Sequence, residues 1–87
     1  MNIGSVVIAL SGRDKGKAFA VIGESDNAFI IANGRARTIE CPKKKNKKHV
    51  EQSGYSISEE AKAKLNEKTL TNRALYREIK SIIEHST

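Results

Sequence analysis

Residues 4–23 decide the fold, and they read GSVVIALSGRDKGKAFAVIG. Two short apolar runs, rich in β-branched residues, flank a polar stretch that contains two glycines. Apolar runs of this length that are bounded by turn residues are typical of β-strands. Gly12 and Gly16 permit positive φ angles, and Asp14 can hydrogen-bond its own backbone. The stretch therefore predicts two strands joined by a tight connection.

The same stretch also invites comparison with a nucleotide-binding P-loop. A P-loop has four residues between its two glycines, then Lys, then a Ser or Thr whose hydroxyl binds Mg²⁺. Here three residues separate Gly12 from Gly16, and Lys17 is followed by Ala18. The segment after Lys17 is β-prone, so no helix N-terminus is expected there to bind phosphates. These requirements exclude a mononucleotide pocket, whereas the three cations of the turn can still contact phosphates of another kind.

Three further segments predict strands. Residues 28–32 form an apolar run, and the Asn33-Gly34 pair after it is a strong hairpin signal. Residues 35–40 alternate in polarity and are expected to form the fourth strand. Residues 49–53 can supply a fifth strand that closes a barrel, and Gly54 then marks a break. Short strands spaced so closely predict a small antiparallel barrel or rolled sheet.

The final third of the chain has a helical pattern. Ser56 and Ser58 are both candidate N-caps of a first helix, since acidic residues follow them. Thr71 is the candidate N-cap of a second, amphipathic helix over residues 72–85. The apolar residues on one face of this helix are Leu75, Ile79, Ile82 and Ile83. We expect this face to pack on the barrel; the alternative is that it fits a groove in a partner protein.

The predicted fold is therefore mainly β with an α-helical C-terminus. Residues 1–54 are expected to form the barrel, with an exposed Lys-rich loop at 42–48. Residues 55–87 are expected to form a C-terminal extension of one or two helices that packs on the barrel.

The charge of the chain is unevenly distributed. Its formal net charge is +6, and residues 1–50 carry ten cations and four anions. Residues 51–87 carry six of each sign, so the whole excess lies in the first part. Since neutralising phosphates releases counterions, this asymmetry is typical of a protein with a polyanionic partner. The alternative is a basic surface that serves solubility only.

Other classes of site are not expected. Cys41 is the single cysteine, which excludes an intramolecular disulfide, and its spacing to His49 and His85 does not fit a zinc site. Asp14 suits a turn better than an acid–base pair with His49, and no nucleophile or paired carboxylates stand out. We expect no enzyme activity, no cofactor, no metal and no small-molecule substrate. Without a signal peptide or a membrane span, we expect a cytoplasmic protein.

The combination of strands, loop and charge resembles a known family. Residues 4–23 resemble the KOW motif of ribosomal proteins and transcription elongation factors, in Gly4 and the valines after it, Gly12, residues 14–17 and the following apolar strand. The continuation NGRARTIECPKKKNKKHV (residues 33–50) is similar to small bacterial KOW-domain RNA-binding proteins related to an archaeal and eukaryotic family of large-subunit ribosomal proteins. In that family a helical tail often carries "TN" before its last helix, as Thr71 and Asn72 do here. The tail of the family is often more basic than the neutral tail of this chain.

The resemblance implies an SH3-like barrel of the KOW type and RNA binding on the ribosome. We therefore expect a non-catalytic RNA-binding protein whose partners are RNA, ribosomal RNA in particular, and ribosomal proteins. The alternative is a protein-interaction module of the translation or transcription machinery. The expected RNA-binding residues are Arg13, Lys15, Lys17, Arg35, Arg37, Lys43, Lys44, Lys45, Lys47, Lys48 and His49.

Most contacts of these residues should be to phosphate, because lysines carry little information about base sequence. Arg35 and Arg37 are the candidates for stacking or bidentate contact. The plainer interpretation is that the two arginines lie on a solvated strand face and that the lysine run is a disordered tether.

Overall fold

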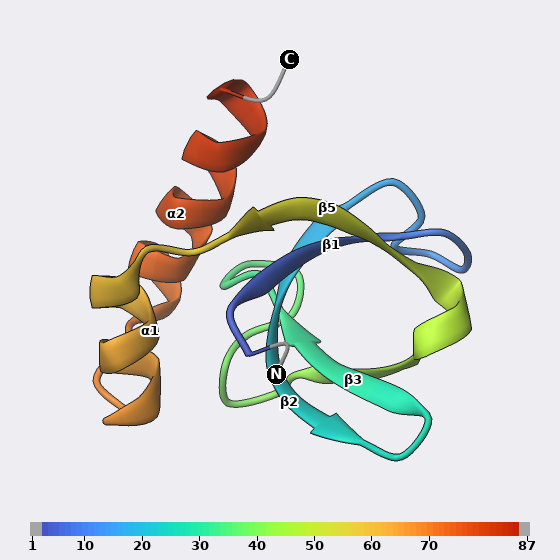
Figure 1. Cartoon of the computed structure of the whole chain (residues 1–87), viewed down its shortest axis with the longest axis horizontal. Helices are drawn as coiled ribbons and strands as arrows, with labels where there is room; N and C mark the ends of the chain where they lie inside the picture. Colours follow the sequence, from blue (N-terminus) through green and yellow to red (C-terminus); the bar gives the residue numbers. More distant parts are fainter. Residues whose placement is uncertain (1–2, 86–87) are drawn as a thin grey trace.

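The computed structural model describes residues 3–85, and within them it shows a five-stranded antiparallel sheet followed by two helices. The strands are β1 (Ser5–Ala9), β2 (Ala18–Ser25), β3 (Ala28–Ala32), β4 (Lys43–Asn46) and β5 (Val50–Ser56). A 3-10 turn, η1 (Lys47–His49), joins β4 to β5, and the helices are α1 (Glu59–Asn66) and α2 (Asn72–His85). The predicted class, mainly β with an α-helical C-terminus, is confirmed (Figure 1).

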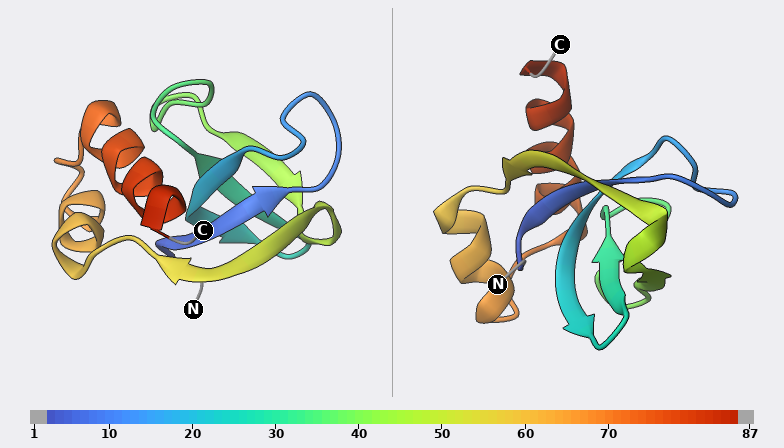
Figure 2. Two further views of the ribbon diagram at one scale, coloured as in Figure 1. Left: turned by 90° about the horizontal axis from the view of Figure 1, so that it is seen from above. Right: turned by 45° about the vertical axis from the view of Figure 1, so that its right-hand side comes forward.

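The sheet is strongly curled. Its strand order is β4-β3-β2-β1-β5, so β4 and β5 are the two edges, yet only the short η1 separates them in the chain. The sheet must bend round for this link to reach from edge to edge, as both views of Figure 2 show. No ladder joins β4 to β5 within residues 3–85. The expected fifth strand is present, but the expectation that it closes the barrel is wrong.

Apolar side chains are buried on both faces of the curled sheet. Successive residues of a strand point to opposite faces, and Val6 and Val7 of β1 accordingly belong to different clusters. The cluster under the helices contains Val6, Ala18, Ala20, Ala32, Ile57, Ala61, Leu70, Leu75 and Ile79. The cluster inside the curl contains Val7, Ala9, Phe19, Val21, Phe29 and Ile31. Burial on both sides explains why the strands read as nearly continuous apolar runs.

The helices pack on the sheet as expected. Ser58 is the N-cap of α1, because its Oγ accepts a hydrogen bond from the Ala61 amide at 3.1 Å, whereas Ser56 ends β5. The helix α2 spans the predicted residues, and Oγ1 of Thr71 accepts from the Ala74 amide at 3.1 Å. Leu75 and Ile79 of α2 are buried in the cluster under the helices, while Ile83 is exposed.

The fourth strand is not where the sequence predicted it. Residues 34–42 form an irregular loop, and the expectation of a strand over 35–40 is wrong. The buried Asn33 side chain accepts hydrogen bonds from the amides of Arg35 and Arg37, both at 3.0 Å, so these amides are turned away from a ladder. The amide of Ile39 donates to Oδ1 of Asn72 at 2.8 Å, which docks the loop onto the start of α2.

The Lys-rich run is ordered instead of forming the expected loop at 42–48. Its first part is β4, which pairs with β3 so that Lys43 lies opposite Ile31 and Lys45 opposite Phe29. Lysines on an edge strand hinder pairing with further chains, so this composition suits the position. Its second part is η1, capped by Asn46, whose Oδ1 accepts from the Lys48 amide at 2.9 Å.

The strand β5 is longer than predicted. It runs on from Ser53 to Ser56 through Gly54, which has a φ of +86°. The register with β1 shifts at this point, between the partners of Ser5 and Val7. Gly54, which was expected to mark a break, therefore lies within β5, at the point where the strand is irregular. Glycine can occupy this position because it readily adopts positive φ.

Candidate nucleic-acid interface

Two loops from distant parts of the sequence are fastened together. The β1–β2 loop (residues 10–17) carries Asp14, whose Oδ2 accepts hydrogen bonds from Nε and Nη2 of Arg37 at 3.3 and 3.2 Å. Nζ of Lys17 lies 3.9 Å from the other carboxylate oxygen. In the left view of Figure 2 this loop and the loop after β3 project on the same side of the sheet. The hydrogen bonds between Asp14 and Arg37 thus bring the cations of the β1–β2 loop close to those of the loop after β3, although the two loops are far apart in the sequence.

The β1–β2 loop is held in place by backbone hydrogen bonds within the loop and to the end of β1. The amide of Gly16 donates to the Ala9 carbonyl at 2.8 Å, and the Lys17 amide donates to the Asp14 carbonyl at 2.9 Å. Gly12 and Gly16 both have positive φ, 79° and 85°, as the predicted turn requires. Arg13 and Lys15 are exposed and form no ion pair within the described part of the chain. Their charges remain available to a ligand.

The lysines of β4 point to two sides. Lys43 and Lys45 are half-buried on the face that carries Phe29 and Ile31, and Lys44 is exposed on the other. Nζ of Lys45 donates to the Ser11 carbonyl at 2.8 Å, which places this charge directly beneath the β1–β2 loop. The basic surface, as we use the term, consists of Arg13, Lys15, Lys17, Arg35, Arg37, Lys43 and Lys45.

The other expected residues lie differently. The amide of Lys47 donates to the Asn27 carbonyl at 2.9 Å, so this residue lies at the β2–β3 turn, away from the basic surface. Its ammonium group pairs with Glu24 and lies 5.2 Å from the centre of the Phe29 ring. Lys48 and His49 are exposed on η1. The structure therefore does not gather all eleven expected residues into one site.

Positive charges greatly outnumber negative charges in the segments that form the basic surface. Residues 10–17 and 33–49 together hold ten cations and two carboxylates, those of Asp14 and Glu40. Asp14 is buried against Arg37, and Glu40 accepts a hydrogen bond from Nδ2 of Asn72 at 2.7 Å. Both carboxylates thus have hydrogen-bond partners, but the Asn72 amide is neutral and Glu40 is exposed, so only the charge of Asp14 is paired. Cations still outnumber carboxylates in these residues by ten to two.

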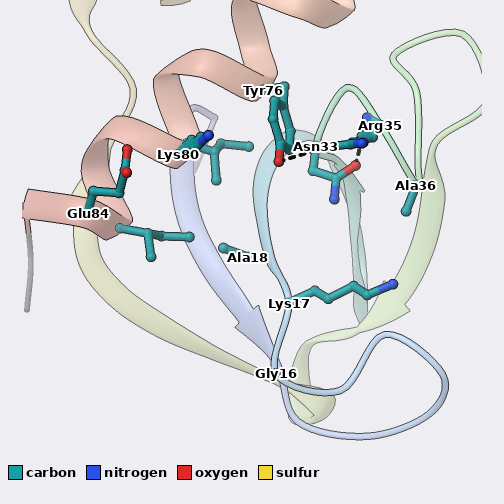
Figure 3. A pocket seen from close by; sticks show the side chains of 11 residues that line it. Gly16, Lys17, Ala18, Asn33, Arg35, Ala36, Tyr76, Lys80 and Glu84 are labelled. Carbon is teal, nitrogen blue, oxygen red and sulfur yellow. Dashed lines mark hydrogen bonds between the residues drawn. The ribbon is translucent and has the colours of Figure 1, made fainter.

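A groove adjoins the basic surface, between the loop after β3, the start of β2 and the outer part of α2 (Figure 3). It measures about 520 Å³ and is lined by Gly16, Lys17, Ala18, Asn33, Arg35, Ala36, Tyr76, Ile79, Lys80, Ile83 and Glu84. Nη1 of Arg35 donates to the Tyr76 hydroxyl at 3.1 Å, and the guanidinium carbon lies 5.2 Å from the ring centre. The groove thus combines an apolar floor with charged and aromatic walls.

Tyr76 and Lys80 were not predicted from the sequence to be functional residues. Both belong to α2, which was expected to pack on the barrel or, alternatively, to fit a groove in a partner protein. The available signal was a tyrosine among the cations Arg73, Arg77 and Lys80 of the same helix. Arg35 approaches it only because residues 34–42 form a loop docked on α2.

The basic surface and the groove are adjacent, since Lys17 and Arg35 belong to both. Among the side chains that the structure describes, no three of His, Cys, Asp or Glu are placed to hold a metal ion. None of the helices in residues 3–85 is long and apolar enough to cross a membrane. Comparison with protein-family models and with curated proteins produced no match for this chain.

Proposed function

We propose that this chain is a non-catalytic, cytoplasmic RNA-binding protein that binds structured ribosomal RNA through the basic surface. The observation that carries the proposal is the hydrogen-bonded pair of Asp14 and Arg37, which holds two cation-bearing loops side by side. Asp14 itself is buried and paired with Arg37, which limits its repulsion of a phosphate strand.

The chemistry of the surface suits phosphates better than bases. Lysine acts as a point charge, and arginine can bind one phosphate through two donors. Arg13 and Lys15 project from a loop that internal hydrogen bonds already fix, so little conformational entropy is lost when they bind. Such contacts position a protein on RNA without reading its sequence.

The ribosomal setting rests on the resemblance of residues 4–23 and 33–50 to KOW-motif ribosomal proteins. Ribosomal RNA and neighbouring ribosomal proteins are the partners that this resemblance implies. In the present chain, Thr71 caps α2 and Asn72 holds the loop after β3, which gives the shared "TN" pair a structural reason.

The proposal is tested by a salt titration of RNA affinity. Fluorescence anisotropy with a structured fragment of ribosomal RNA should show log K falling by about 0.7 to 0.9 per decade of salt for each neutralised phosphate. The double variant Arg13→Gln/Lys15→Gln should lower the slope by about 1.4 to 1.8. The control Lys64→Gln/Lys68→Gln removes the same charge from exposed positions in and just after α1 and should leave the slope unchanged. A slope near zero for the unmodified chain contradicts the proposal.

The alternative function is a protein-interaction module, and the observation in its favour is the apolar floor of the groove. Ribosomes isolated from cells with and without nuclease treatment separate the two functions. An RNA-binding protein is released when accessible RNA is digested. A chain that remains bound through ribosomal proteins after digestion supports the alternative.

A further inference from the structure

We propose that the groove between α2 and the loop after β3 receives one unstacked base of an RNA strand whose phosphates lie on the basic surface. This inference rests on the proposed function and adds a second element to it, a site for single-stranded RNA. Bases of a loop or bulge can leave the stack and be held by aromatic and guanidinium groups. Bases in a duplex are paired and stacked, and extruding one costs free energy.

The floor of the groove is apolar. Ala18 and Ile79 are buried beneath it, and Ala36 and Ile83 line its sides. Its volume of about 520 Å³ lies within the range of small-molecule sites. Such a floor excludes water from one surface of a flat ring, which is what a base requires when it leaves its neighbours in the strand.

The walls supply a stacking surface. Tyr76 is half-buried, and Figure 3 shows its hydroxyl directed toward the guanidinium of Arg35. The guanidinium lies within cation–π distance of the ring. The guanidinium donates to the neutral hydroxyl of Tyr76, and no ion pair joins Arg35 to a carboxylate among the described residues. Ring and guanidinium together form one polarisable surface against which a base can lie.

The rim has the charge that a nucleotide requires. Lys17, Arg35 and Lys80 provide three cations around the groove, against the single carboxylate of Glu84. An apolar floor with a cationic rim complements a base joined to a phosphate, because the base can cover the floor while the phosphate meets the cations. Lys17 and Arg35 also belong to the basic surface, so one strand can follow both without interruption.

The test uses Tyr76 as a reporter. The chain has two tyrosines, and Tyr55 is exposed on β5 outside the groove. In the Tyr55→Phe variant labelled with 3-fluorotyrosine, the only fluorine signal therefore comes from Tyr76. A short single-stranded RNA should shift this signal with the same dissociation constant that anisotropy gives. A duplex RNA of equal length should bind without a comparable shift.

A matched set of variants then measures the contribution of the ring. Tyr76→Ala should weaken single-strand binding about tenfold and leave duplex binding unchanged, the size expected for one lost base-stacking contact. Tyr76→Phe keeps the ring and should retain the affinity, while Tyr55→Ala is the control for an exposed tyrosine. Ala36→Leu narrows the groove without removing a ring and should also weaken single-strand binding only.

The outcomes distinguish the two proposals. If single-stranded RNA binds but the fluorine signal does not move, or if Tyr76→Ala weakens single-strand and duplex binding equally, the base site is refuted and the basic surface remains. If neither RNA binds with a salt-dependent affinity, the proposed function itself fails. The fluorine measurement decides the matter even if Tyr76→Ala does not fold, because it uses a chain with an intact groove.

Discussion

Asp14 accepts two hydrogen bonds from Arg37, and through them the β1–β2 loop and the loop after β3 become one unit. We expect Asp14→Ala and Arg37→Ala each to lower the free energy of unfolding by about 1 kcal/mol, since the pair is charged but partly exposed. The double variant should cost little more than either single one. Urea unfolding of the four proteins measures the coupling, and additive effects would show that the pair contributes nothing.

Gly34 and Gly16 offer a comparison between a close contact and backbone strain alone. A Cβ at Gly34 would lie 2.1 Å from the carbonyl oxygen of Asn72, and φ there is +81°. A Cβ at Gly16, with φ +85°, would meet nothing within 4 Å. Gly16→Ala should therefore cost about 1 to 2 kcal/mol from the left-handed backbone, and Gly34→Ala about 3 kcal/mol or more.

Thermal unfolding of these two alanine variants checks the prediction. Equal losses would mean that the loop after β3 is not held against α2 as closely as the structure places it.

Asn72 is expected to hold the loop after β3 in place. Its Oδ1 accepts from the Ile39 amide at 2.8 Å, and its Nδ2 donates to Glu40 at 2.7 Å. Asn72→Ala should lower the free energy of unfolding by about 1 to 2 kcal/mol, because the Ile39 amide loses its acceptor. Hydrogen exchange of that amide should accelerate more than the exchange of amides in β1. Asn66→Ala, at an exposed position in α1, serves as the control.

Neighbouring lysines of β4 should differ in their effect on RNA binding. Lys45 donates to the Ser11 carbonyl beneath the β1–β2 loop, while Lys44 points to the opposite face. Lys45→Met should reduce the salt slope of RNA binding by about 0.7 to 0.9, the value for one phosphate contact. Lys44→Met removes the same charge and should have less effect. Equal effects would indicate that the run contributes only its total charge.

Much of the fold could be predicted from local patterns. The strands β1 to β3 are apolar runs bounded by turn residues, and α2 has both a capping Thr71 and a regular apolar face. Each of these signals lies within one segment, so no knowledge of the neighbours was required. The same holds for the β1–β2 turn, whose glycines have the expected positive φ.

The errors occur where residues outside a segment determine its conformation. Residues 35–40 alternate like a strand, but Asn33 and Asn72 capture their amides, and Asn72 lies more than thirty residues away. The lysines of β4 have low strand propensity and form a strand because β3 offers an unpaired edge. The groove was missed for the same reason, since Arg35 and Tyr76 meet only after the loop docks on α2.

The position of β4 at the edge of the sheet also affects how charge variants must be interpreted. One side of β4 pairs with β3, and within residues 3–85 no strand pairs with its other side. Lysine is one of the residues that keep such an edge from pairing with another copy of the chain. Replacing these lysines by neutral residues would therefore remove the proposed phosphate contacts and at the same time favour self-association. Sedimentation measurements on each variant should accompany its RNA titration, because aggregation and loss of binding would otherwise give the same signal.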